Sequence, residues 1–138
     1  MFFFIYFLNF HANIGKNKSF IIKQLKQSKA LIFPSLCYEG FPMVIVESFA
    51  TGTPVITSNI GSQAEIVKNN YNGLHFQVGN AESLAKVLKK FDNLKDKTKF
   101  YKNARNTYLK KYTPEINYKL LMNIYNQTIE DAKKNKNY

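Results

Sequence analysis

The stretch YEGFPMVIVESFATGTPVI, residues 38–56, decides the fold. It begins with a Gly-Phe-Pro turn and continues as an apolar helix from about Met43. Gly52 follows as a left-handed helix stop, and a short β-type run completes the stretch. Two glutamates, Glu39 and Glu47, stand eight positions apart, one on the turn and the other on the helix. The stretch therefore predicts a loop, a helix and a strand in succession.

The same alternation continues on both sides of this stretch. We expect strands at residues 2–8, 30–33, 54–57 and 74–76, and helices at residues 19–28, 43–51, 62–67, from 80 onward, 96–112 and 114–133. Such β-α-β-α order predicts a parallel sheet flanked by helices. Ligands of such sheets bind at the carboxyl ends of the strands. The loop that carries Glu39 follows a strand and precedes a helix, so we expect it at that end.

Several side chains are expected to cap the helices or to pack them against other elements. Ser62, Asn80 and Thr113 are predicted to cap the helices that follow them. Apolar positions at helical spacing are expected to pack against other elements. They are Leu84, Val87 and Leu88 in one helix, and Tyr101, Tyr108, Tyr112, Ile116, Leu120 and Ile124 in the last two.

Length and composition indicate one globular domain or part of one. The chain has 138 residues, of which 45% are hydrophobic. Cys37 is the sole cysteine, which favours a reducing compartment and a cytoplasmic location, with the inner face of a membrane as an alternative. The apolar residues 1–8 lack a basic flank and are far shorter than the roughly 20 residues of a membrane span.

The net charge of +11 is unevenly spread. Residues 86–138 hold 14 Lys and Arg against 5 Asp and Glu, a net charge of +9. An anionic partner such as a membrane face is one interpretation, but a solvated lysine-rich surface is the more common cause of such runs. Nucleic acid is not an expected partner, because the chain has no recognisable binding module and Arg105 is its sole arginine.

The residue types in the stretch 38–56 are suited to binding a sugar and a phosphate. Gly40 removes side-chain bulk where a ligand would approach the backbone. The amides of Met43 to Ile45 would be unpaired donors at the positive end of a helix, which attracts phosphate. Glu47 could accept hydrogen bonds from a vicinal diol, and Glu39 could bind hydroxyls at the other end of the ligand. The alternatives are a solvated Glu47 and a Glu39 that only closes its turn, although the apolar neighbours of Glu47 indicate partial burial.

These motifs resemble the signature of the family-4 retaining glycosyltransferases, which have the GT-B fold. The matching segments stand in the family's order over about residues 5–91. They are ALIFPS at 30–35, EGFP at 39–42, ESFATGTPVI at 47–56, GS at 61–62, EIV at 65–67 and NGL at 72–74.

The resemblance implies part of a Rossmann-like C-terminal domain of the GT-B fold. Residues 1–138 would form a single domain of this type, with a motif core at 30–91 and C-terminal helices at 96–135. Its implied activity is hexosyl transfer in glycan or polysaccharide biosynthesis, from a nucleotide-diphosphate sugar to an unknown acceptor, with retention. No cofactor and no metal are implied, and the aspartates Asp92, Asp96 and Asp131 cannot form an Asp-x-Asp metal motif.

The resemblance also assigns site residues. Glu39 would be catalytic and contact the sugar, and Glu47 would hold the ribose hydroxyls. The donor-binding set would be Glu39, Gly40, Phe41, Pro42, Met43, Val44 and Glu47. Gly61, Ser62 and Glu65 would organise the loop beside the donor. His11, His75 and Cys37 match no catalytic pattern and are expected to be structural or surface residues.

Some family features have no counterpart in the chain. The basic Arg and Lys pair that the family places against the diphosphate is missing, and so is an acceptor-binding N-terminal domain, which would be a separate or missing partner. We therefore interpret the sequence as a fragment. An inactive remnant or interaction module is the alternative function, and an epimerase or phosphorylase of the same fold is a weaker third.

Overall fold

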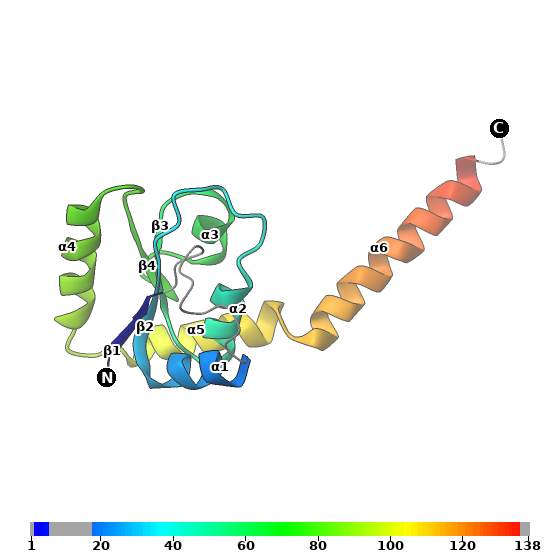
Figure 1. The fold of residues 1–138 in the computed structure, drawn as a ribbon. Coiled ribbons are helices and arrows are strands. Elements are labelled where there is room, and N and C mark those ends of the chain that lie inside the picture. Colours follow the sequence, from blue (N-terminus) through cyan, green and yellow to red (C-terminus); the bar gives the residue numbers. More distant parts are fainter. Residues whose placement is uncertain (1, 6–17, 136–138) are drawn as a thin grey trace.

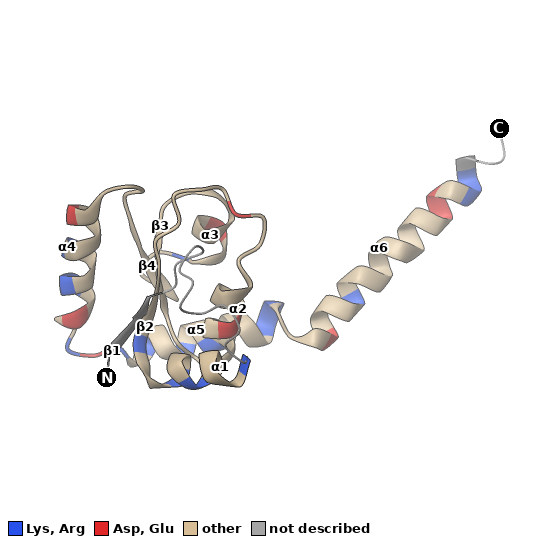
Figure 2. Ribbon diagram, in the orientation of Figure 1, with Lys and Arg blue, Asp and Glu red and all other residues tan. Residues whose placement is uncertain are grey.

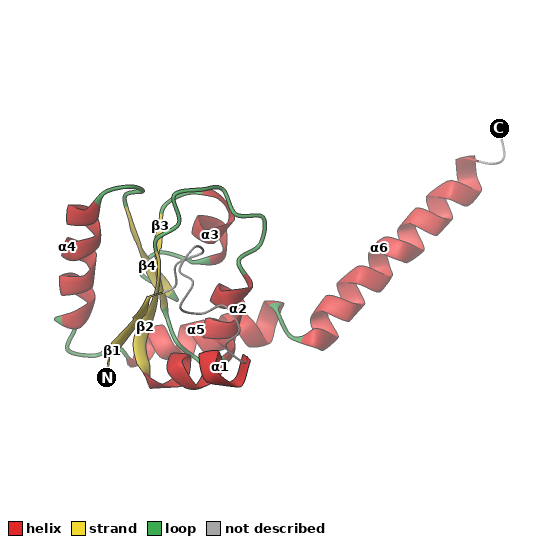
Figure 3. Cartoon of the chain, in the orientation of Figure 1, coloured by secondary structure: helices red, strands yellow, loops and turns green. Residues whose placement is uncertain are grey.

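The computed structural model describes residues 2–5 and 18–135, and Figures 1 and 3 show a central sheet between helices. The sheet has four strands in the order β1-β2-β3-β4, and each neighbouring pair is parallel. Leu31 lies opposite Val55, which in turn lies opposite Gly73. The strands are β1 (Phe2–Ile5), β2 (Ser28–Phe33), β3 (Val55–Ser58) and β4 (Gly73–Phe76).

The described part of the chain contains six helices, of which the first five lie around the sheet. Helix α4 covers one face, with Phe100 at the start of α5 packed beside it, while α1, α2, α3 and the rest of α5 lie toward the other (Figure 1). Their bounds are α1 (Lys18–Gln27), α2 (Met43–Ala50), α3 (Gly61–Ile66), α4 (Ala81–Asp92), α5 (Thr98–Lys111) and α6 (Pro114–Asn135).

Neighbouring residues of β2 and β3 supply two separate cores. Leu31 and Phe33 of β2 belong to the core beside α1, α2 and α5, whereas Ala30, which precedes Leu31, belongs to the core beside α4. This is the period-2 alternation of a strand that is buried on both faces. On the α4 side, Leu84, Val87 and Leu88 pack as the sequence pattern predicts.

Most predicted elements are confirmed within a few residues at their ends. The Asn80 side chain caps α4 by accepting a hydrogen bond from the Ser83 amide over 2.8 Å. Thr113 Oγ1 accepts one from the Ile116 amide over 3.4 Å at the start of α6, and Gly52 has a φ of +77°. The predicted strand at 6–8, the connector at 9–17 and His11 lie outside the described residues.

One prediction about α3 is wrong. Ser62 does not cap this helix, because the helix begins one residue earlier and Ile60 is its N-cap without a side-chain bond. Glu65 lies near the end of the helix. The cause is Gly61, whose φ of +57° turns the chain directly into the helix and leaves the Ser62 hydroxyl free to reach another loop.

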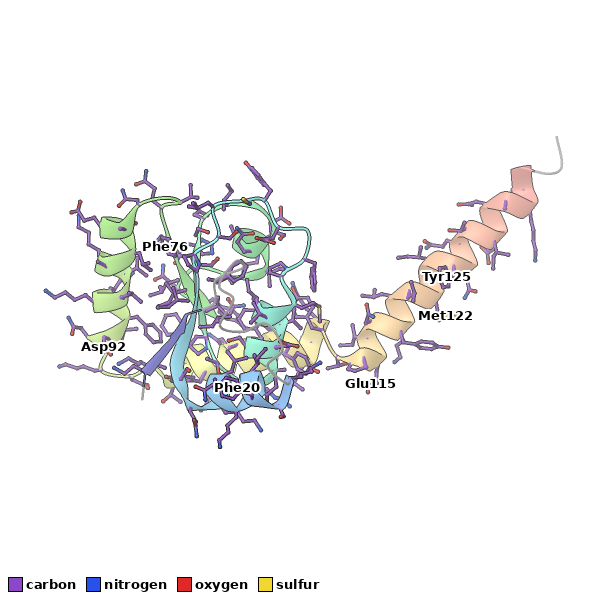
Figure 4. The ribbon with its side chains drawn as sticks, in the orientation of Figure 1. Phe20, Phe76, Asp92, Glu115, Met122 and Tyr125 are labelled. Atoms are coloured by element: carbon purple, nitrogen blue, oxygen red, sulfur yellow. The ribbon has the colours of Figure 1, made fainter. Side chains whose placement is uncertain are left out.

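Helix α6 runs away from the body of the molecule (Figure 1), and the side chains of Met122 and Tyr125 project from its distant part (Figure 4). Tyr108 and Tyr112 of the preceding segment pack against the core as expected. The packing predicted for Leu120 and Ile124 is wrong, since these residues are 56% and 57% exposed on α6. None of the helices within the described ranges has the length and apolar character needed to cross a membrane.

Candidate functional site

The loop between β2 and α2 lies at the carboxyl end of β2, as predicted. Its anchor is Ser35, which is buried and follows the strand directly after Pro34. The Ser35 hydroxyl donates a hydrogen bond to Glu39 Oε1 over 2.7 Å. The Ser62 hydroxyl donates to the Glu39 carbonyl oxygen over 2.7 Å. Glu39 is therefore half-buried and held from two sides.

The start of α2 presents fewer free amides than expected. Pro42 is the N-cap, and the Ile45 amide donates to the Pro42 carbonyl oxygen over 3.0 Å. The prediction of an unpaired Ile45 donor is therefore wrong, because the first turn closes tightly on the proline. The amides of Met43 and Val44 have no backbone acceptor within residues 18–135. Two donors thus remain for a ligand at the positive end of the helix.

Gly40 stands in an open position on this loop. A Cβ added there would meet no atom of the described chain within 4 Å. Its φ also lies outside the left-handed range that favours glycine. Folding of the described residues therefore does not require a glycine at this position. Close approach of a ligand to the backbone would require one.

Beside the helix lies a pocket of about 660 Å³, a volume typical of small-molecule sites. Glu47 lines it, and its side chain is 21% exposed, so the predicted partial burial is confirmed. The carboxylate Oε1 lies 3.5 Å from the Nζ of Lys18. The remaining lining residues come from α1, the loop before α2, α2 itself, the end of α5 and the start of α6: Ile22, Phe41, Met43, Val46, Ala50, Tyr108, Lys111, Tyr112, Pro114 and Asn117.

The charge around this pocket is mainly positive. Helix α1 carries three lysines and no acid, and α5 carries four lysines, Arg105 and no acid (Figure 2). Of these cations, Lys18 and Lys111 line the pocket. With Glu47 as the pocket's acidic residue, the lining favours an anionic ligand that also carries hydroxyl groups.

The structure brings some of the predicted site residues together and separates others. Phe41, Met43 and Glu47 share the pocket, whereas Glu39 is not part of its lining. Pro42 and Val44 are buried, so their contribution to a ligand would come from the backbone.

The three predicted loop-organising residues differ in position. Gly61 faces the loop, since a Cβ there would lie 3.0 Å from the Tyr38 ring. Ser62 reaches the loop through its bond to Glu39. Glu65 is exposed, and in the part of the chain that the structure describes no hydrogen bond joins it to the loop.

Sequence reasoning missed several residues near the site. Lys18 and Lys111 enter the pocket from helices that are distant in sequence, and no local motif marks them. Tyr112 was expected to pack and does so, but its ring also meets Phe41 edge to face with centroids 6.0 Å apart. Leu36 and Tyr38 are 67% and 81% exposed, and their place directly before Glu39 was a signal that could have found them.

The remaining candidates behave as structural or surface residues. The His75 Nε2 lies 2.8 Å from the Val67 carbonyl oxygen, and burial lowers the pKa of the ring, an effect that the Val67 bond opposes and nearby Lys68 reinforces. Cys37 is exposed. Among the described residues, no group of three His, Cys, Asp or Glu side chains could hold a metal ion.

Known proteins match the chain over the region that contains these motifs. Residues 8–107 match the family described as "Glycosyl transferases group 1". An Escherichia coli UDP-Gal:alpha-D-GlcNAc-diphosphoundecaprenol alpha-1,3-galactosyltransferase is 35% identical over 59% of the chain and 21% of its own length. A Campylobacter jejuni N,N'-diacetylbacillosaminyl-diphospho-undecaprenol alpha-1,3-N-acetylgalactosaminyltransferase is 27% identical over 83% of the chain and 30% of its own length. The chain thus spans about a fifth to a third of these curated relatives.

Solved structures share the fold. A glycosyltransferase from Rickettsia africae ESF-5 superposes with a TM-score of 0.74 at 28% identity, over 82% of this chain and 31% of that one. Anabaena HepE in complex with UDP-glucose superposes with a TM-score of 0.69 at 23% identity, over 77% of this chain and 30% of that one. The predicted fold class, a parallel α/β sheet as in GT-B glycosyltransferases, is confirmed.

Proposed function

Because the chain belongs to the group 1 glycosyl transferases, we propose that it binds a nucleotide-diphosphate sugar as the donor of a retaining, family-4 type glycosyl transfer. The supporting observation is the position of two glutamates. Glu39 lies on the loop before α2, and Glu47 lies on α2 itself, where it lines a pocket of about 660 Å³. A relative whose name includes UDP-Gal, and a structural neighbour in complex with UDP-glucose, favour the same ligand class.

In this proposal, the ribose, the diphosphate and the sugar of the donor each contact a different part of the protein. The Glu47 carboxylate accepts hydrogen bonds from the ribose hydroxyls, in place of its contact with Lys18. The amides of Met43 and Val44 face the diphosphate at the start of α2, with the Gly40 and Phe41 backbone beside them. Glu39 acts as the catalytic residue and contacts the sugar hydroxyls.

Lys18 and Lys111 supply positive charge to the pocket in the proposed complex. Both line the pocket, and Lys18 lies 3.5 Å from Glu47. A diphosphate carries at least two negative charges at neutral pH, so ammonium groups that line the pocket favour its binding.

Calorimetry on the purified chain tests the proposal. We expect heat of binding with at least one of UDP-glucose and GDP-mannose, and we expect the Glu47→Gln chain to bind that donor at least tenfold more weakly. Glu82→Gln is the matched control, because Glu82 is an exposed helical glutamate paired with Lys86 on α4, away from the site. Equal affinities of the parent and Glu47→Gln chains would refute the role of Glu47.

The alternative is a chain that keeps this fold without donor affinity, as an inactive remnant or interaction module. The contact between Lys18 and Glu47 is the observation that favours it, since the carboxylate already has a partner. The absence of binding heat with UDP-glucose, GDP-mannose, UDP and GDP in the same titrations would support this alternative over donor binding.

A further inference from the structure

The hydrogen bonds around Glu39 hold its side chain and its backbone separately. Ser35 at the end of β2 donates to Glu39 Oε1, and Ser62 in α3 donates to the Glu39 carbonyl oxygen, each over 2.7 Å. Two elements that are well separated in sequence thus converge on one residue. The bond to the carboxylate is the charge-assisted one and is therefore the stronger of the two.

Ser35 itself is firmly placed. It is 8% exposed, and its carbonyl oxygen accepts a hydrogen bond from Ser58 Oγ over 2.6 Å, which ties it to the end of β3. The Ser35 hydroxyl has a second possible acceptor, the Cys37 carbonyl oxygen at 3.3 Å. Since a hydroxyl has one proton, the shorter bond to the Glu39 carboxylate takes it.

The backbone between Ser35 and Glu39 is also fixed. The Cys37 amide donates to Ser35 Oγ over 3.3 Å. Gln63 is fully buried, and its Nε2 donates to the Cys37 carbonyl oxygen over 3.3 Å. That carbonyl therefore has a donor of its own and does not depend on Ser35.

We propose that Ser35 is a positioning residue that turns the Glu39 carboxylate toward the sugar of the bound donor, an inference that rests on the proposed function. A glutamate side chain has several rotatable bonds, and fixing one carboxylate oxygen removes most of that freedom before the ligand arrives. Oε1 is engaged by Ser35, and within the described ranges no hydrogen bond reaches Oε2. Oε2 is therefore the atom that accepts from a sugar hydroxyl.

A purely structural serine would act differently. If Ser35 only held the loop together, its loss would weaken every ligand that touches the loop, including a nucleotide without a sugar. A serine that orients Glu39 affects only the part of the ligand that Glu39 contacts. The ratio of the affinities for UDP-glucose and UDP therefore separates the two roles.

Calorimetric titration of UDP-glucose and of UDP into four chains of 138 residues makes this test. They are the parent, Ser35→Ala, Ser35→Thr and Ser48→Ala. Ser48 is the matched control, because it is fully buried and donates to a backbone carbonyl, that of Thr53, over 2.9 Å. We expect Ser35→Ala to bind UDP-glucose about three- to tenfold more weakly, the range of a lost hydrogen bond, with UDP affinity unchanged. Ser35→Thr keeps the hydroxyl and should restore most of the UDP-glucose affinity.

The remaining outcomes are also decisive. In a Glu39→Ala background, Ser35→Ala should cause no further loss of UDP-glucose affinity. Equal weakening of UDP and UDP-glucose by Ser35→Ala, or no change in either, overturns the positioning role while leaving the proposed function in place. A parent chain that binds neither ligand overturns the proposed function and this inference with it.

Discussion

Gly40 and Gly73 are glycines for different reasons. A Cβ at Gly40 would meet nothing within 4 Å, whereas a Cβ at Gly73 would lie 2.0 Å from the Val55 carbonyl oxygen of the neighbouring strand. We expect Gly40→Ala to leave the free energy of unfolding within about 0.5 kcal/mol of the parent, a typical surface effect, while weakening donor binding. Gly73→Ala should lose about 2–3 kcal/mol through overpacking. Urea unfolding and calorimetry measure the two effects, and a strongly destabilised Gly40→Ala chain would contradict the ligand interpretation of this position.

His75 gives the protein a pH dependence near neutrality. Burial lowers the pKa of its ring below the ordinary value near 6.5, so the unfolded chain binds the proton more readily than the folded one. The free energy of unfolding should therefore be highest above pH 6.5 and fall as the pH drops through 6.5 toward the folded pKa. Urea unfolding at pH 7.5 and pH 5.5 measures this loss. His75→Gln should show a smaller difference between the two pH values, and an unchanged difference would argue against His75 as its source.

Helices α3 and α4 show how the same kind of sequence signal can lead to different structures. Asn80 and Ser62 were both predicted caps, yet only Asn80 accepts from an amide of its own helix. We expect Asn80→Ala to cost about 1 kcal/mol of unfolding free energy, with Asn80→Asp close to the parent. Chemical denaturation followed by circular dichroism checks both variants. A neutral Asn80→Ala would mean that the observed cap contributes nothing to stability.

The Ser62 hydroxyl bonds to the Glu39 carbonyl oxygen instead of its own helix. We therefore expect Ser62→Ala to lose about 1 kcal/mol, the net value of one hydrogen bond, through a looser loop and with the helix content unchanged. Trypsin cannot report on this loop because it contains no lysine or arginine, but hydrogen exchange of its amides can. Faster exchange at residues 36–42 in Ser62→Ala, with α3 unchanged, is the expected pattern. Faster exchange confined to α3 would restore the capping interpretation.

At the scale of the whole molecule, the sequence predicted what depends on local pattern. The strands, the helices around them and the position of the Glu39 loop follow from β-α alternation and from turn residues such as Gly52. The pocket around Glu47 could not be predicted, because Lys18 and Lys111 reach it from helices whose placement depends on tertiary packing. The first turn of α2 was mispredicted for a different reason, since the Ile45 amide makes a local bond to the carbonyl oxygen of Pro42, three residues earlier, a tightened turn that is common at helix ends.

Helix α6 is the element that contributes least to the rest of the fold. Six of its large apolar side chains are 41% exposed or more, namely Tyr118, Leu120, Leu121, Ile124, Tyr125 and Ile129. A helix without a packed face is marginal in water, so we expect its amides to exchange with solvent far faster than those of α2. Hydrogen exchange followed by mass spectrometry measures the two rates in one sample.

A chain that ends at Asn117 retains every residue that lines the pocket and removes the exposed part of α6. Because the removed side chains bury little surface on the body, the melting temperature should stay within about 2 °C of the parent value. Donor affinity should also be unchanged, since no pocket group has been lost. A large drop in melting temperature, together with slow exchange in α6 of the parent, would instead mean that this helix folds back onto the sheet domain in solution.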